Sequence, residues 1–219
     1  MDLFSRSWSA LRAAVEEVSG AQWIRPSGCT GWLVQDLVFH LIIDAQDLLI
    51  TLATPSTAEP AIDAVSYWQL DENAPDGTDP HSEFVRRSAN AYGSTDGEYG
   101  VKYHFNDLAG AAARVAGTAD PADRVETRGQ TLTVADYLGA YVVEATLHHL
   151  DLVAHLPEIP APPAEGLATT RHVLEKLAGT TIPASFTDRD AVLVATGRRA
   201  PTEAETAALG DLALPLVLG

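Results

Sequence analysis

Glu144 and His148 lie four residues apart in an apolar, helix-length segment near the middle of the chain. In an α-helix this spacing places the two side chains on one face, about 40° apart around the axis. Their neighbours Val142, Val143 and Leu147 are apolar, and a charge buried among such residues without a partner is costly. A carboxylate and an imidazole in this arrangement can bind one divalent cation. We therefore predict a metal site on this helix.

A third ligand is expected from a second helix. His40 lies on the inward stripe of the apolar segment over residues 33–53, and facing helices of a bundle can converge on one ion. Three protein ligands leave a coordination position for water or substrate, and two His with one Glu suit zinc among other first-row ions. From the residues alone, a solvated or hydrogen-bonded Glu/His pair without metal stays open as an alternative. His149 points about 100° away from His148 and is not expected to be a ligand.

Two acidic residues are placed to orient the histidine ligands from behind. Asp151 lies three residues beyond His148 and can accept the second imidazole proton, which would fix the metal-binding tautomer. Asp36 lies four residues before His40 and is expected to do the same; the alternative is a favourable acid in the first turn of the helix. Cys29 precedes that helix, and we expect it to pack rather than to react.

Composition restricts the location and the partners. The chain of 219 residues has 14 Lys and Arg against 30 Asp and Glu, a net charge of −16. Such acidity argues against nucleic acid or an anionic membrane surface as a partner. No apolar run reaches membrane-spanning length, and the first residues lack the basic and apolar stretches of a signal peptide. With one cysteine and hence no internal disulfide, we expect a cytoplasmic monomer or homodimer.

The elements that must position these side chains are helices. Apolar residues at three- and four-residue spacing predict long helices over residues 3–18, 33–53, 82–116 and 133–155. Glycines 93, 97 and 100 predict a break or a kink in the third, and Thr133 with Asp136 marks the start of the fourth. Residues 54–80 are expected to be a long connection without packed structure, and residues 118–130 another connection. The pattern predicts an all-α four-helix bundle.

The C-terminal part is set off by a proline-rich segment. We expect a bundle domain over residues 1–156, a stiff linker over 157–165 and a short, mostly helical extension over 166–219. Within the extension we expect a helix over residues 167–177, a short strand or turn over 191–195 and a helix over 202–209.

Two motifs resemble those of a known family. Cys29-Thr30-Gly31-Trp32-Leu33-Val34-Gln35-Asp36-Leu37-Val38-Phe39-His40-Leu41 is similar to the Cys-Pro-Gly-Trp-x-Val-x-Asp-Leu-x-x-His-Leu signature of the mycothiol-dependent maleylpyruvate isomerase family, a branch of the DinB-like metal-binding bundles. Glu144-x-x-x-His148-x-x-Asp151-Leu152 resembles its second signature. The resemblance covers residues 1–155. It implies a DinB-like up-and-down four-helix bundle in which His40, Glu144 and His148 bind a divalent ion, usually zinc, and an open coordination position receives the thiol of mycothiol.

The resemblance also implies a chemistry. A cation stabilises the thiolate, which is the nucleophile. In the isomerase mechanism the metal-bound thiolate adds to a conjugated carbon, permits rotation about the former double bond, and leaves; related members transfer the thiol or displace a leaving group. We therefore expect an isomerase or S-transferase that acts on a small electrophile. The alternatives are a non-catalytic metal- or thiol-binding module, such as a sensor or resistance factor, and a structural bundle without metal.

The sequence departs from the family pattern at three places. Thr30 stands where the family usually has Pro, which is a mild change. Leu33 stands where a Thr or Ser would cap the second helix, so the start of that helix must be held otherwise. The characterised isomerase type carries a larger second domain with a substrate-binding arginine, whereas this chain resembles a short form without the full C-terminal domain. Its segment from Thr196 to Pro201 is similar to the Thr-Gly-Arg-x-Pro ending of shorter members. Arg198 or Arg199 could hold a substrate carboxylate bidentately; a solvated pair on a surface turn is the alternative.

Overall fold

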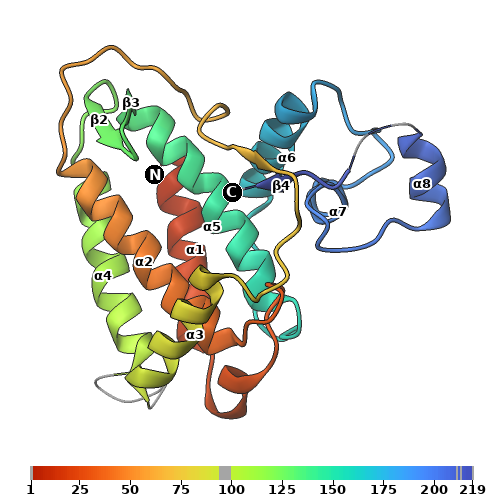
Figure 1. The fold of residues 1–219 in the computed structure, drawn as a ribbon, viewed down its shortest axis with the longest axis horizontal. Coiled ribbons are helices and arrows are strands. Elements are labelled where there is room, and N and C mark those ends of the chain that lie inside the picture. Colours follow the sequence, from red (N-terminus) through yellow and green to blue (C-terminus); the bar gives the residue numbers. More distant parts are fainter. Residues whose placement is uncertain (1, 94–99, 211, 213, 219) are drawn as a thin grey trace.

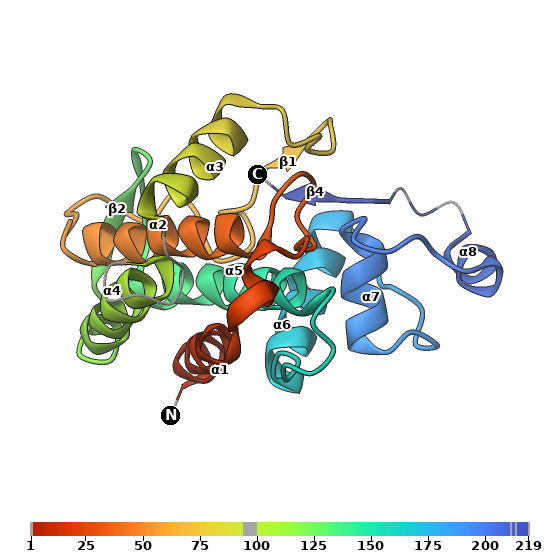
Figure 2. The ribbon, with the colours of Figure 1, turned by 90° about the horizontal axis from the view of Figure 1, so that it is seen from below.

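Four helices lie side by side and form the body of the protein (Figures 1 and 2). The computed structural model describes residues 2–93, 100–210, 212 and 214–218. The bundle helices are α1 (Leu3–Glu17), α2 (Val34–Leu52), α4 (Val101–Ala116) and α5 (Val134–Val153). Helix α2 packs mainly on α4, helix α1 packs mainly on α5, and α3 (Pro80–Tyr92) covers the outer side of α2. The predicted all-α bundle is confirmed. None of the described helices combines the length and the apolar character needed to cross a membrane.

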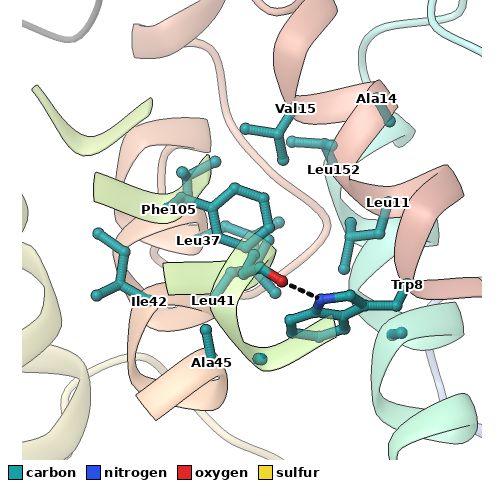
Figure 3. Packing of buried hydrophobic residues seen from close by; sticks show 14 of the residues in the cluster. Trp8, Leu11, Ala14, Val15, Leu37, Leu41, Ile42, Ala45, Phe105 and Leu152 are labelled. Atoms are coloured by element: carbon teal, nitrogen blue, oxygen red, sulfur yellow. Dashed lines mark hydrogen bonds between the residues drawn. The ribbon is translucent and has the colours of Figure 1, made fainter. Parts of the chain in front are cut away.

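The apolar stripes of the four helices meet in one core (Figure 3). Trp8 is 1% exposed, and its indole N–H donates a hydrogen bond to the carbonyl oxygen of Ala109 at 3.0 Å, which joins α1 to α4. The side chains around it are fully or almost fully buried, among them Leu11, Val15, Leu37, Leu41, Phe105 and Leu152.

The ends of the helices follow from their capping residues. Thr133 accepts a hydrogen bond from the backbone N–H of Asp136 at 3.0 Å, as its position predicts. Leu33 offers no such cap to α2. Instead the carboxylate of Asp36 accepts a hydrogen bond from the backbone N–H of Leu33 at 2.9 Å, so the third helical residue holds the start of the helix from inside.

The predicted interruption of the 82–116 helix is confirmed, because it separates α3 from α4; Gly93 and Gly100 flank it, and Gly97 lies outside the described residues. Two predicted connections differ from the structure. The connection at 118–130 was predicted wrongly, because it contains a hairpin of β2 (Arg124–Thr127) and β3 (Gln130–Thr133). The connection at 54–80 does pack, since Trp68 is 8% exposed within a second core.

That second core lies between α5 and the C-terminal helices α6 (Ala164–Ala178) and α7 (Asp188–Ala195). The predicted strand or turn at 191–195 is wrong: Thr187 accepts a hydrogen bond from the backbone N–H of Asp190 at 3.1 Å and starts α7. Beyond α8 (Glu203–Leu209) the chain returns, and β4 (Val217–Leu218) pairs with β1 (Leu70–Asp71). A 3-10 turn, η1 (Gly20–Ile24), follows α1.

The hydrogen bond of Trp8 gives a test of the bundle core. Trp8→Phe removes both that donor and buried ring atoms, and we expect it to lower the free energy of unfolding by about 1–3 kcal/mol. Trp68→Phe is the matched control, because the buried indole N–H of Trp68 has no acceptor among the described residues. Urea unfolding of both variants should show the larger loss of unfolding free energy for Trp8→Phe. Equal losses would mean that the hydrogen bond of Trp8 does not stabilise the core.

Candidate metal centre

Four side chains from two helices converge at one point inside the bundle. His40 and Asp44 come from α2, and Glu144 and His148 come from α5. One ligand atom of each lies within 4.8 Å of all the others. Oε1 of Glu144 lies 3.0 Å from Nε2 of His148 and 3.8 Å from Nε2 of His40. The predicted trio of His40, Glu144 and His148 is thus brought together across the two helices.

Asp44 is the member that sequence reasoning missed. Its Oδ1 lies 3.6 Å from Nε2 of His40, one helical turn away on α2. The signal was present, because His40 and Asp44 have the same four-residue spacing in an apolar segment as Glu144 and His148. In the sequence, Asp44 stood out only as a charge that interrupts an apolar run.

Burial and mutual attraction determine the charges of the cluster. Burial raises the pKa of Asp44 to about 6, although His40 opposes the shift. Burial alone would raise the pKa of Glu144 too, but the charge and hydrogen bond of His148 lower it. Burial would conversely lower the pKa of His148, yet Glu144 and Asp151 raise it well above its usual value. Without a cation, a proton on His148 therefore compensates the buried carboxylate of Glu144.

The residues fit a divalent cation. Oδ2 of Asp44 is buried and has no hydrogen-bond partner among the described residues, which is costly for a carboxylate unless a cation takes that place. Both histidines turn Nε2 toward Oε1 of Glu144. Two imidazole nitrogens and two carboxylates suit zinc and other first-row ions.

The outer face of His148 is held by a chain of contacts. Its Nδ1 lies 3.2 Å from Oδ2 of Asp151, where the sequence placed a hydrogen-bond acceptor for this ring. Arg198 in turn donates two hydrogen bonds of 2.8 Å to the two oxygens of Asp151. Burial alone would raise the pKa of Asp151, but Arg198 and His148 hold it well below its usual range. Asp151 thus stays a carboxylate that can accept the Nδ1 proton of His148.

Cys29 lies on the same side of His148. Its Sγ is 3.9 Å from Nδ1 of His148, and burial, together with the charge of Asp151, raises the pKa of its thiol. Cys29, His148 and Asp151 form a second group of ligand atoms that could hold an ion. Because that group would use Nδ1 of His148 rather than Nε2, it would exclude the Asp151 contact that orients the ring.

The remaining candidates occupy other positions. Nδ1 of His40 lies 3.4 Å from Nε2 of His81, which is exposed but reaches the site. Asp36, expected to contact the ring of His40, instead accepts a hydrogen bond from the backbone N–H of Leu33 at the start of α2. His149 lies 2.9 Å from the carbonyl oxygen of Pro160, outside the cluster.

Neither C-terminal arginine has an unpaired guanidinium. Arg198 is bound bidentately by Asp151, as described above. Arg199 lies 3.1 Å from Asp190 and 2.7 Å from Glu205, and these ion pairs join α7 to α8. Arg198 therefore reaches the site, but as the partner of a protein carboxylate.

The bundle with converging histidines and carboxylates defines a metal-binding bundle of the DinB-like class. Within that class, residues 4–153 match the family described as the mycothiol maleylpyruvate isomerase N-terminal domain. Because the match covers well over half of the chain, the protein belongs to this family. The matched segment includes all four converging residues and Asp151, whereas Arg198 lies beyond that segment. Comparisons with curated proteins and with solved structures found no match.

The bidentate pair of Arg198 gives a test of how the site is supported. Arg198→Gln leaves the carboxylate of Asp151 buried without its cation, and we expect the free energy of unfolding to fall by about 3–5 kcal/mol at pH 7. The loss should shrink on acidification, because Asp151 can then be protonated in the variant. Arg199→Gln is the control; its more exposed ion pairs should cost about 1 kcal/mol or less. Denaturant titrations at pH 7 and pH 5 measure both, and equal losses would contradict a special role for Arg198.

Proposed function

We propose that this protein is a divalent-metal-dependent enzyme, an isomerase or S-transferase that uses a small thiol of the mycothiol type as a nucleophile toward a small electrophile. The observation that carries the proposal is the convergence of His40, Glu144 and His148 across α2 and α5, inside the segment that matches the family. Zinc is the ion we propose, because it accepts both imidazole and carboxylate ligands without a fixed geometric preference. When bound, such an ion lowers the pKa of a coordinated thiol and so favours the nucleophilic thiolate at neutral pH.

The protein's own residues prepare the site. The carboxylate of Asp151 accepts a hydrogen bond from the Nδ1–H of His148, and this tautomer leaves the lone pair of Nε2 free to face the cluster. Arg198 keeps Asp151 charged and in place. His40 lies on the other ligand helix, α2. The rings of Trp32 and His81 lie 5.1 Å and 5.4 Å from the ring of His40 and limit the orientations open to its imidazole.

Asp44 has a separate role in this proposal. Its Oδ2 is buried and has no hydrogen-bond partner among the described residues. We propose that this carboxylate accepts the proton that the thiol loses, because a carboxylate oxygen without a partner beside the ligand set can act as a general base. The four-residue step from His40 places it beside the ligands.

The same residue supports a second candidate function. If Asp44 binds the ion, four protein ligands complete a tetrahedron, as in structural zinc sites, and no position remains for a thiol. The protein would then be a non-catalytic metal-binding module. The spacing of at most 4.8 Å between the four ligand atoms is the observation that favours this alternative.

Metal content tests the site itself. Protein purified without an affinity tag should contain about one equivalent of zinc. Losing a residue that hydrogen-bonds to a ligand typically lowers metal affinity about 10- to 100-fold, and His148→Ala, which removes a ligand itself, should lower the zinc affinity further. His155→Ala is the control, since His155 is exposed just beyond the end of α5. Competition with a chromogenic chelator measures the affinity. Zinc affinity that is unchanged in His148→Ala would refute the proposed site.

Thiol binding separates the two candidate functions. In cobalt-substituted protein, mycothiol should change the visible spectrum if a coordination position is open, and thiol-dependent turnover of an electrophile panel should be lost in His40→Ala. Asp44→Asn should keep the spectral change but lower turnover by about 10²- to 10⁴-fold if Asp44 is a proton acceptor. If only Asp44→Asn, and not the unaltered protein, responds to mycothiol, Asp44 is a fourth ligand and the binding module is favoured.

A further inference from the structure

A small pocket lies beside the β2–β3 hairpin, away from the ligand cluster. It has a volume of about 180 Å³ and is lined by Ile62, Tyr67, Gln69, Thr127, Arg128 and Gln130. We call it the hairpin pocket. Among the described residues, Arg128 is the only charged one in its lining, although acidic residues outnumber basic ones by 30 to 14 in the chain. The pocket therefore presents a local positive charge on a protein whose overall charge repels anions.

The guanidinium of Arg128 makes few contacts within the described part of the protein. Its one described contact is with the ring of Tyr67, whose centroid lies 5.7 Å from Cζ, and it has neither an ion pair nor a hydrogen bond among the described residues. Arg124 on the same hairpin, by contrast, forms an ion pair with Glu59 at 2.9 Å. Since an arginine carries five N–H donors in a planar fork, Arg128 retains its full capacity to bind an anion.

The backbone at Arg128 is unfavourable for an arginine. Arg128 has a φ of 51° and Gly129 a φ of 75°, and the two residues form the turn between the paired residues Thr127 and Gln130. Two-residue turns with positive φ at both positions favour Asn, Asp or Gly at the first, because a larger side chain crowds its own backbone there. A strained residue of the wrong type is a common feature of functional sites. Turn chemistry alone does not account for Arg128.

A row of aromatic rings connects the pocket with the metal centre. The ring of Tyr67 contacts that of Tyr137 at 6.2 Å, and Tyr137 contacts Tyr141 at 5.0 Å. Tyr141 lies one turn before Glu144 on α5, so the step from Glu144 to Tyr137 spans about 10 Å along the helix. Partial burial alone would lower the pKa of Arg128, but Tyr67 and the charges of Asp47 and Glu144 raise it, so the side chain stays charged.

We propose that the hairpin pocket is a carboxylate-binding subsite, in which Arg128 holds the carboxylate of a small substrate. A planar carboxylate matches the guanidinium fork, and Gln69 and Gln130 in the lining can supply further amide donors. This substrate class rests on the proposed function, whereas the binding of a carboxylate at Arg128 does not require the metal.

Binding of a simple dicarboxylate to the metal-free protein tests the subsite. Malonate should bind saturably and shift the amide resonances of residues 127–130 in ¹H–¹⁵N spectra, and neutral malonamide should not. Arg128→Gln should weaken malonate binding by about 10- to 100-fold, the loss expected for charge-assisted hydrogen bonds. Arg124→Gln, on the same hairpin, is the matched control and should bind like the unaltered protein.

The outcomes distinguish this proposal from the proposed function. Equal malonate affinity in the unaltered protein and in Arg128→Gln would overturn the subsite, as would equal losses in Arg124→Gln and Arg128→Gln. Malonate binding that requires zinc and disappears in His148→Ala would place the anion on the ion; the subsite would then be wrong and the metal site right. Binding that depends on Arg128 in a protein that takes up no zinc would sustain the subsite and refute the metal enzyme.

A stability measurement excludes a merely structural role for Arg128. Arg128→Asn places a residue suited to the left-handed backbone in the turn, so the melting temperature should rise while malonate binding is lost. A melting temperature that falls would show that Arg128 stabilises the hairpin and would overturn the proposal.

Discussion

Two facing helices bury two imidazoles and two carboxylates where a bundle ordinarily places only apolar side chains. The desolvation of such groups is costly unless they neutralise one another or a cation does so. His40 and Asp44 on α2 meet Glu144 and His148 on α5, and the four groups do not satisfy one another completely, because the buried Oδ2 of Asp44 has no hydrogen-bond partner among the described residues. Much of the surrounding structure keeps these four side chains in register.

Helix α5 is the element on which this register depends. It is buried on one side by the bundle and on the other by α6 and α7, so its sequence is apolar nearly all round. At its C-terminal end, the backbone N–H of Gly28 donates a hydrogen bond to the carbonyl oxygen of Asp151 at 2.8 Å. A Cβ at Gly28 would come within 2.6 Å of Oδ1 of Asp151, so only glycine permits this approach. Arg198 holds the same carboxylate from the C-terminal extension. The extension thus stabilises the ligand helix from outside the segment that matches the family.

The sequence predicted the features whose signals are local and periodic. The four bundle helices, the Thr133 cap and the trio of His40, Glu144 and His148 follow from three- and four-residue spacing. The hairpin at 124–133 was missed because its strands are short and its turn begins with Arg128 rather than Asn or Asp. Helix α7 was missed because five apolar residues do not distinguish a helix from a strand, although Thr187 and Asp190 carried the capping signal. The roles of Arg198 and of the β1–β4 pair depend on contacts between distant residues, which no local pattern contains.

Asp44 is the residue that decides between an open and a closed site. A closed structural zinc site needs four ligands that face the ion equally, and such sites are usually built from Cys and His. Here Nε2 of His40 lies 3.6 Å from Oδ1 of Asp44 and 3.8 Å from Oε1 of Glu144, so Asp44 is as near to this imidazole as Glu144 is. The second oxygen of Asp44, unpaired among the described residues, is the atom that either binds the ion or accepts a proton. Two carboxylates among four groups are unlike the Cys and His sets of structural sites, and this is the physical reason why the function that we propose has three ligands, His40, Glu144 and His148, with Asp44 as the proton acceptor.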